Sequence, residues 1–132
     1  MTIKLSTRLR VLPNIAPQDI TTARTGAYAD ASGAQALLVA VNAGPVAPTK
    51  TVTLQMMQAV DANGTSAKAL GAPVTVTAPT GGSAIAFTAD AQITDLDDNN
   101  GFAFVAALLS SNNASAVLAA ATLILGNNRF NP

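Results

Sequence analysis

Two apolar runs near the end of the chain, residues 101–109 and 116–125, constrain its fold more than any other feature. Both runs are apolar at odd and at even positions, which is typical of strands that are covered on both faces. A polar connector, residues 110–115, separates them, and the second run stops at Gly126. We therefore predict a β-hairpin at the centre of a sheet.

A buried helix over residues 114–125 is the alternative, because alanine is the best helix former and this segment is rich in it. Periodicity alone does not separate a buried helix from a buried strand in so short a run. The strand is favoured because the rest of the chain has the pattern of strands.

The upstream chain is divided into short segments by recurrent Gly, Pro and Asn turn signals, among them Asn63-Gly64. Such spacing favours an antiparallel sandwich over alternating strands and helices. The predicted fold is all-β, a single antiparallel β-sandwich that is jelly-roll-like or Ig-like, with an extended N-terminal arm. The expected strands are residues 36–42, 51–60, 67–70, 74–77 and 83–88, with weaker alternation in 20–30.

The strand predicted at residues 51–60 alternates most clearly, with Val52, Leu54 and Met56 on one face. The doubled Met56-Met57 interrupts this alternation. Either a β-bulge or burial on both faces explains the interruption.

Residues 1–19 have no clean period, and Pro13 and Pro17 exclude both a continuous helix and an interior strand. An extended arm that orders on a neighbour and a first edge strand of the sandwich are both compatible with this pattern. We divide the chain into an arm at 1–19, a β-sandwich domain at 20–126 and a C-terminal tail at 127–132.

Charge is scarce in this chain. Of its 132 residues 49% are hydrophobic and only 11% are charged, with a net charge of zero. A free monomer of this composition is poorly protected against association, so we expect it to pack against partners. No apolar run has the length of a membrane span, and residues 1–6 lack the pattern of a signal peptide. We expect a soluble chain that is made in the cytoplasm of a host cell.

Cys, His, Trp and Glu are all absent. Their absence removes the thiol nucleophile, the imidazole base and the commonest zinc ligands, and we expect no enzyme activity and no cofactor. Nucleic-acid binding is disfavoured as well, because a neutral chain with one Tyr and four Phe lacks a basic stripe and a stacking platform.

The acidic segment around Asp95, Asp97 and Asn99 has the ligand spacing with which a calcium loop begins. The rest of that motif fails, because Gly101 comes one position late and Ala106 stands where the bidentate Glu belongs. A plain acidic turn that leads into a strand is the favoured interpretation, and no metal site is assigned.

Basic residues concentrate at the two ends of the chain. Within the first 24 residues four bases oppose the single Asp19, a net charge of +3. The tail combines an arginine with a large aromatic residue, a pair that often anchors interfaces. The candidate interface residues are Lys4, Arg8, Arg10, Arg24, Arg129 and Phe130.

The order of features along the chain resembles the small capsid decoration or auxiliary head proteins of tailed bacteriophages and phage-like gene transfer agents. The likeness lies in a lead-in to Thr25–Tyr28, the strands Gln35–Asn42 and Thr53–Asp61, and an alanine-rich final strand that ends in Gly126–Pro132. It implies a non-catalytic β-sandwich that binds the outside of an assembled capsid in many copies, with the major capsid protein as partner.

Two functional hypotheses follow. The first is a virion structural protein on the capsid surface that bridges and stabilises neighbouring subunits, as a homo-oligomer for which a trimer is one arrangement, without nucleic acid or membrane. The second is a host-surface adhesin or spike module that binds glycan, although its usual aromatic platform is missing and Tyr28 stands alone.

Overall fold

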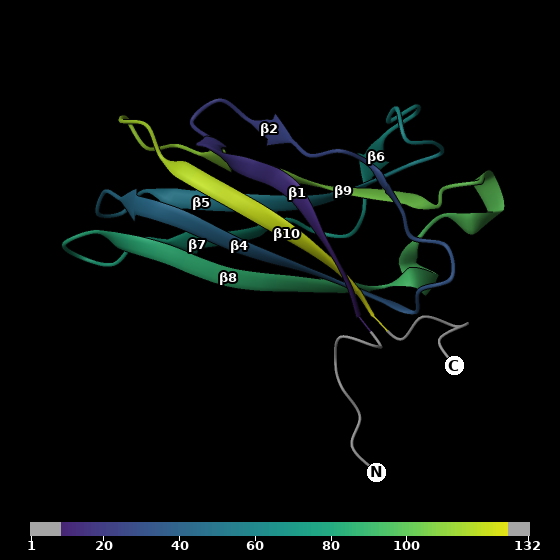
Figure 1. Cartoon of the computed structure of the whole chain (residues 1–132). Coiled ribbons are helices and arrows are strands. Elements are labelled where there is room, and N and C mark those ends of the chain that lie inside the picture. Colours follow the sequence, from purple (N-terminus) through teal and green to yellow (C-terminus); the bar gives the residue numbers. More distant parts are fainter. Residues whose placement is uncertain (1–8, 127–132) are drawn as a thin grey trace, which may run out of the picture.

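Four strands form the first layer of the molecule, sheet A. The computed structural model describes residues 9–126, and in it the order of sheet A is β1-β10-β4-β8, with every neighbouring pair antiparallel (Figure 1). The bounds of these strands are Leu9–Asp19 for β1, Leu118–Gly126 for β10, Ala36–Val46 for β4 and Ser83–Gln92 for β8.

Sheet B is the second layer, and its two edges are made of short pieces. Two central strands, β9 (Phe104–Ser111) and β5 (Thr51–Ala59), pair with each other. The free side of β9 pairs with β2 (Arg24–Thr25) and β3 (Ala29–Asp30), and β5 pairs with β6 (Lys68–Ala69) and β7 (Val74–Thr77).

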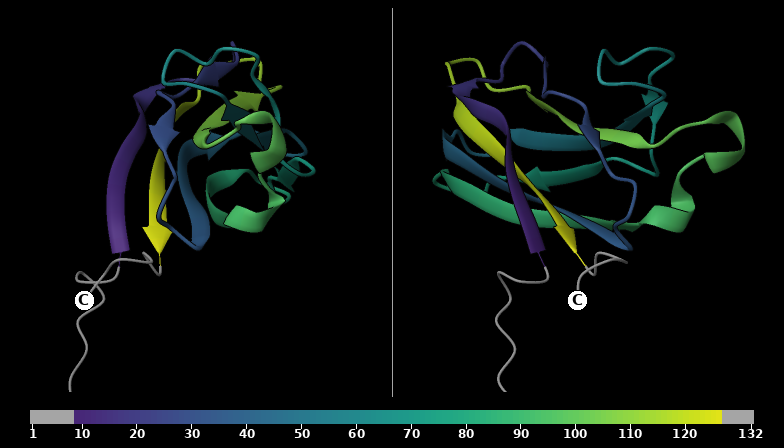
Figure 2. Two further views of the ribbon diagram at one scale, coloured as in Figure 1. Left: turned by 90° about the vertical axis from the view of Figure 1, so that its right-hand side faces the viewer. Right: turned by 45° about the vertical axis from the view of Figure 1, so that its right-hand side comes forward.

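Counting β2 with β3, and β6 with β7, as one position each gives two layers of four (Figure 2). Counted in this way, successive positions along the chain alternate between the two layers, except that β5 is followed by β6–β7 in the same sheet. This is the arrangement of a jelly roll, in which two Greek keys close on each other. The predicted all-β antiparallel sandwich is confirmed, in its jelly-roll form.

The predicted hairpin of the two apolar runs is wrong. β9 lies in sheet B between β5 and the β2–β3 edge, whereas β10 lies in sheet A between β1 and β4. The connector therefore crosses from one layer to the other. Each run is apolar because it is the central strand of its own sheet, and that environment gives the same sequence pattern as a central hairpin.

The last apolar run is a strand, as favoured, and not the alternative helix. β10 pairs with β4 from Ala119↔Ala43 to Gly126↔Ala36 and with β1 from Leu9↔Gly126 to Asp19↔Leu118. Ladders on both sides satisfy its backbone groups along most of its length, so alanine's helix propensity is overridden by tertiary context.

Residues 9–19 form the edge strand of sheet A, one of the two interpretations left open for this segment. The register of β1 against β10 shifts between Pro13 and Ile15 and again between Ile15 and Gln18. Proline has no N–H for a ladder, so an irregular edge is the position that tolerates it.

Two predicted strands extend further than expected, and one is regular where a bulge was considered. β4 continues through Gly44 and Pro45 after a register shift, and β8 continues to Gln92. β5 pairs with β9 without a shift from Val52 to Ala59, so Met57 simply faces outward and no bulge is present.

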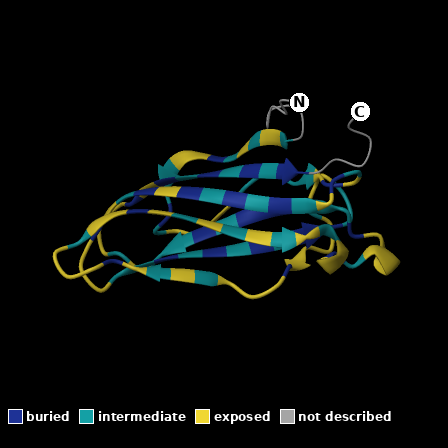
Figure 3. Ribbon diagram, turned by 90° about the horizontal axis from the view of Figure 1, so that it is seen from below, coloured by how far each residue is buried: buried dark blue, intermediate teal, exposed yellow. Residues whose placement is uncertain are grey.

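The core lies between the two sheets and is built from alternate residues of the central strands. Exposed residues gather in the loops at the two ends (Figure 3). No helix within residues 9–126 has the length and apolar character needed to cross a membrane. The fully buried large side chains are Ile20, Leu37, Val39, Val41, Val46, Val52, Leu54, Val105, Leu109, Val117, Leu123 and Leu125.

Candidate interaction surfaces

The outer face of sheet A is apolar and almost free of charge. The pairings place Val11, Ile124, Leu38 and Asp90 side by side in one row across the sheet. The next two rows contain only proline, threonine, alanine and asparagine, and beyond them Leu118 pairs with Asp19. We define the outer face of sheet A by Val11, Pro13, Asp19, Leu38, Ala40, Asn42, Ala86, Thr88, Asp90, Leu118, Ala120, Thr122 and Ile124.

Two large apolar side chains stand out on this face. Val11 is 60% exposed and Leu118 is 63% exposed, the large hydrophobic residues with the greatest exposure among residues 9–126. They come from neighbouring strands, β1 and β10. A single exposed apolar residue is ordinary, but two on a face with only two charged residues, Asp19 and Asp90, mark a surface suited to protein contact.

The outer face of sheet B has a different chemistry. Its strands present hydroxyl and amide groups, such as Thr53, Thr75 and Gln55. Thr53 Oγ1 and Thr75 Oγ1 lie 3.1 Å apart in a cross-strand hydrogen bond. This polar region covers part of the face, because Met57, Ala106 and Leu108 on the same side of sheet B are apolar.

One end of the sandwich is acidic. The loops that join β5 to β6 and β8 to β9 meet there, with Asp61, Asp95, Asp97 and Asp98. Lys68 Nζ lies 2.6 Å from Asp97 Oδ2 and 4.3 Å from the centroid of the Phe102 ring. The hydrogen bond from Lys68, followed by that from Asn100, lowers the pKa of Asp97.

The acidic segment folds as two short 3₁₀ turns, Ile93–Asp95 and Asp98–Asn100. Asp95 Oδ2 accepts a hydrogen bond from the Gln92 N–H at 3.1 Å, and Gly101, at φ +82°, closes the second turn. Within residues 9–126 no three metal-binding side chains come together. Of the two carboxylates that resembled a calcium loop, Asp95 accepts a hydrogen bond from Gln92 N–H, and Asp97 accepts from Asn100 and from Lys68 of β6.

The opposite end is held by uncharged amides and one carboxylate. Asp19 Oδ1 accepts hydrogen bonds from the N–H groups of Thr21, at 3.0 Å, and Val117, at 3.1 Å. These bonds, with that of the Thr21 hydroxyl, lower the pKa of Asp19. Asn112 Oδ1 accepts from Thr51 N at 2.8 Å. The crossing from β9 to β10 is thereby fixed to two neighbouring strands.

The edge of the sandwich at β1 is closed by Asn14, which lies in the first irregularity of that strand. Its Nδ2 donates to Ala27 O at 2.7 Å and its Oδ1 accepts from Ala107 N at 2.8 Å. The side chain thus links sheet A to sheet B. Gly26 leaves room for it, because a Cβ there would lie 2.0 Å from Asn14 Oδ1.

Two of the predicted interface residues, Arg10 and Arg24, lie in the described part of the chain. Both donate a hydrogen bond to a backbone carbonyl oxygen elsewhere in the sandwich. The guanidinium of Arg10 donates to Asp30 O at 2.7 Å, and Arg24 Nε donates to Asp19 O at 3.1 Å. They lie in different sheets, so the structure does not bring them together. The other four candidates, Lys4, Arg8, Arg129 and Phe130, lie outside residues 9–126.

Sequence reasoning missed Val11 and Leu118 as surface residues. Val11 lies among basic residues without a clean period, and Leu118 lies in a run that was apolar at every position. The available signal was the small-residue alternation of β10, in which Ala120, Thr122 and Ile124 share the side of Leu118.

The comparisons with known proteins agree with this fold. The chain is similar to the PBSX exported protein XepA (TM-score 0.58, 16% identity, 96% of this chain and 39% of that one). It is also similar to the infectious bursal disease virus VP2 subviral particle protein (TM-score 0.52, 10% identity, 94% and 33%). A further likeness is to a protein of the Gx strain of that virus (TM-score 0.51, 11% identity, 95% and 34%).

The chain spans only about a third to two fifths of these solved chains. No protein-family model matches it, and no curated protein matches it in sequence. At such low identity the likeness concerns the fold. The class it defines is the jelly roll that viral capsid proteins share.

Proposed function

We propose that the protein is a structural virion protein of the capsid decoration type, which binds the exterior of an assembled capsid in many copies. In this role it bridges neighbouring capsid subunits and needs neither a catalytic group nor a cofactor. The observation that carries the proposal is the outer face of sheet A, with Val11 and Leu118 more than half exposed and only two charged residues, Asp90 and Asp19, the latter opposite Leu118.

The chemistry of the two outer faces supports one orientation on the shell. An apolar face gains free energy when it is removed from water, by roughly 25 cal/mol per Å². The region of sheet B around Thr53 and Thr75, which are already hydrogen-bonded to each other, gains little from the same burial. We therefore place sheet A against the major capsid protein and sheet B toward solvent.

In this proposal the basic residues form the charged rim of the interface. Arg10 is adjacent to Val11 in β1, and residues Leu9 and Gly126 are paired, so both ends of the described chain join the sandwich at one place. Rim charges of this kind set orientation and association rate more than affinity. In this proposal Lys4, Arg8, Arg10, Arg24, Arg129 and Phe130 contact capsid subunits around the apolar face.

Selective binding explains how such a protein reinforces a shell. A partner that binds only the assembled state stabilises that state by mass action, without any chemical step. The jelly-roll fold supports this role, because viral capsid proteins use the same architecture.

The test uses purified particles that lack the protein, to which the chain or a variant is added before imaging by cryo-electron microscopy. Leu118→Asp places a charge on the outer face of sheet A, and Thr77→Asp places one at an exposed site of sheet B. We expect Leu118→Asp to lose most of its occupancy and Thr77→Asp to bind like the unchanged chain.

A truncation of residues 1–8 tests the part of the predicted arm that precedes β1, because it leaves that strand complete from Leu9. Reduced occupancy by this variant is expected. Equal occupancy by all variants would refute the proposed contacts. Glycan binding without any capsid binding would favour the adhesin hypothesis instead.

A further inference from the structure

The free edge of β8 is long and regular. Its pairing with β4 continues without interruption from Ile85↔Ala43 to Gln92↔Ala36. β8 is the last strand of sheet A on that side. It contains no proline and no lysine, and Asp90 is its one charged residue. An unpaired row of N–H and C=O groups of this kind is a template for another strand.

No other sheet edge in the described part of the chain is both long and regular. β1 has two prolines and two register shifts. The edges of sheet B consist of two-residue and four-residue pieces. Short, bulged or proline-containing edges are the usual protection against edge-to-edge pairing. β8 alone among residues 9–126 remains a full-length open edge.

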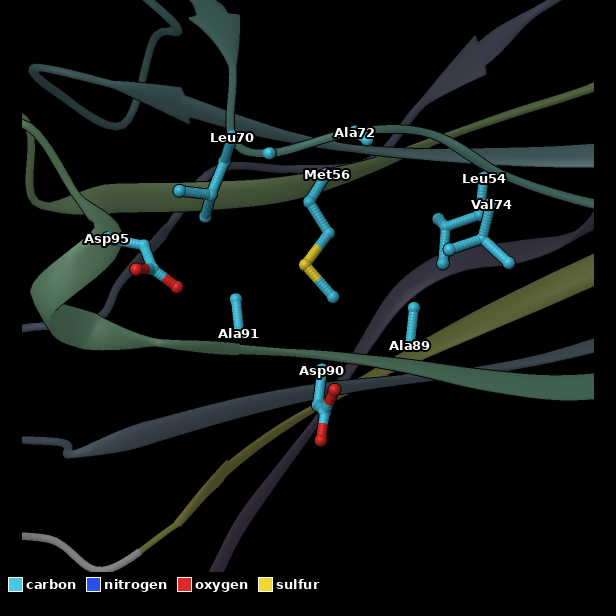
Figure 4. Close-up of a pocket in the computed structure, with 10 residues that line it drawn as sticks. Leu54, Met56, Leu70, Ala72, Val74, Ala89, Asp90, Ala91 and Asp95 are labelled. Atoms are coloured by element: carbon cyan, nitrogen blue, oxygen red, sulfur yellow. The ribbon is translucent and has the colours of Figure 1, made fainter.

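A cleft beside β8 is lined largely by apolar side chains. It lies between β8 and the β6–β7 edge of sheet B and has a volume of about 140 Å³ (Figure 4). The Met56 side chain points into it from sheet B, while the small side chains of Ala89 and Ala91 leave it open from sheet A. The opposite edge of the sandwich is closed by Asn14. The cleft therefore lies beside the free backbone edge of β8.

The residues of β8 that face the core are self-complementary in size. In chain order they are Ile85, Phe87, Ala89 and Ala91, two large side chains followed by two small ones. When such a strand pairs antiparallel with a copy of itself about Thr88, each large residue lies opposite a small one. Phe87 then meets Ala89 of the second copy, next to the cleft, and Ile85 meets Ala91.

The outward residues of β8 fit the same register. Asp90 lies opposite Ala86 of the second copy, Gln92 lies opposite Ala84, and Thr88 meets its own counterpart. Directly opposed like charges would destabilise an antiparallel pair, and this register contains none. Antiparallel pairing about an axis perpendicular to the sheet also keeps the core-facing sides of both copies together, as a two-fold contact requires.

We propose that β8 is a homodimerisation edge: two copies of the chain pair through β8 in antiparallel register, with the two-fold axis at Thr88. Main-chain hydrogen bonds provide the adhesion, as in other cases of strand addition. The pairing joins two copies of sheet A into one continuous sheet, so their apolar outer faces form a single larger surface. This contact belongs to the free protein and does not depend on capsid binding.

Cysteine cross-linking tests both the contact and its register, because the natural chain contains no cysteine. Directly opposite residues of an antiparallel pair have Cα atoms about 4.5–5.5 Å apart, within the range for a disulfide. Thr88→Cys should therefore give a disulfide-linked dimer on mild oxidation. Ala84→Cys is the matched control on the same side of β8, since eight residues separate it from its counterpart, about 27 Å at 3.4 Å per residue.

Charge substitutions provide a second readout by analytical ultracentrifugation. Thr88→Lys sets two lysines opposite each other and should raise the dimer dissociation constant about fivefold, whereas Ala86→Lys meets Asp90 and should lower it about as much. A chain that sediments as a monomer up to millimolar concentration would overturn the proposal. Equal cross-linking of Ala84→Cys and Thr88→Cys, or the same shift for both lysine variants, would overturn it as well.

Discussion

Replacing Asn14 by alanine should destabilise the sandwich at the edge where β1 meets sheet B. The change removes the acceptor of the Ala107 N–H and the donor to Ala27 O. Ala27 is exposed, so water replaces its lost partner. Ala107 is fully buried, and its N–H is left without one.

The expected loss of stability follows from this difference between the exposed Ala27 carbonyl and the buried Ala107 N–H. An unsatisfied buried donor costs about 1–3 kcal/mol, whereas a solvent-replaceable hydrogen bond contributes little. An unfolding entropy of about 2.1 cal/mol/K per residue amounts to about 0.28 kcal/mol/K for 132 residues. The expected loss in Tm is therefore about 4–11 °C, measurable by calorimetry together with the free energy of unfolding in urea.

Two variants make the experiment specific. Asn14→Asp keeps an acceptor for Ala107 but loses the donor to Ala27, so its loss should be the smaller one. Asn42→Ala removes an exposed amide from the outer face of the same sheet and should leave Tm unchanged. If Asn14→Ala melts like Asn42→Ala, or if Asn14→Asp is as damaging as Asn14→Ala, the reasoning is wrong.

Two further changes probe the core and the acidic end. Leu123→Ala, in the fully buried centre of β10, should lower the free energy of unfolding by about 2–5 kcal/mol in a urea titration, and a loss below 1 kcal/mol would contradict the dry interior described above. The lowered pKa of Asp97 predicts stability that is complete above the pKa of an unfolded Asp and is lost as the pH falls through the folded pKa. Asp97→Asn should remove part of that acid-side loss in melting curves recorded from neutral to strongly acidic pH, and an unchanged slope would show that the contact with Lys68 has no such effect.

The sequence was sufficient to predict most of the strands but not their partners, and it left open whether residues 9–19 form a strand. Alternation in β5 identified Val52, Leu54 and Met56 as the buried side, and all three are buried. The pairing of residues 101–125 could not be read in the same way. A central strand is apolar on both sides whether its sequence neighbour pairs with it or lies in the opposite sheet, so only the tertiary structure separates the hairpin from the crossing.

The candidate surface was harder to predict than the fold. Charged residues attract notice in a chain with so few of them, and the predicted interface consisted of five basic residues and Phe130. The exposure of Leu118 depends on which side of β10 faces sheet B, and a run without polar residues does not mark that side. Asn14 closes an edge of the sandwich through two hydrogen bonds to residues distant in sequence, and no local sequence pattern indicates such bonds.

The position of β10 also sets the order in which the molecule is completed. β1 and β4 are not hydrogen-bonded to each other, and β10 fills the place between them. During synthesis sheet A therefore lacks a central strand until residues 118–126 have left the ribosome, while the strands of sheet B are already available to pair. Contacts between strands so distant in sequence form slowly, and incomplete sheets expose edges that aggregate. β10, the last strand among residues 9–126, completes one of the two layers, and a chain that stops short of it leaves β1 with no sheet to join.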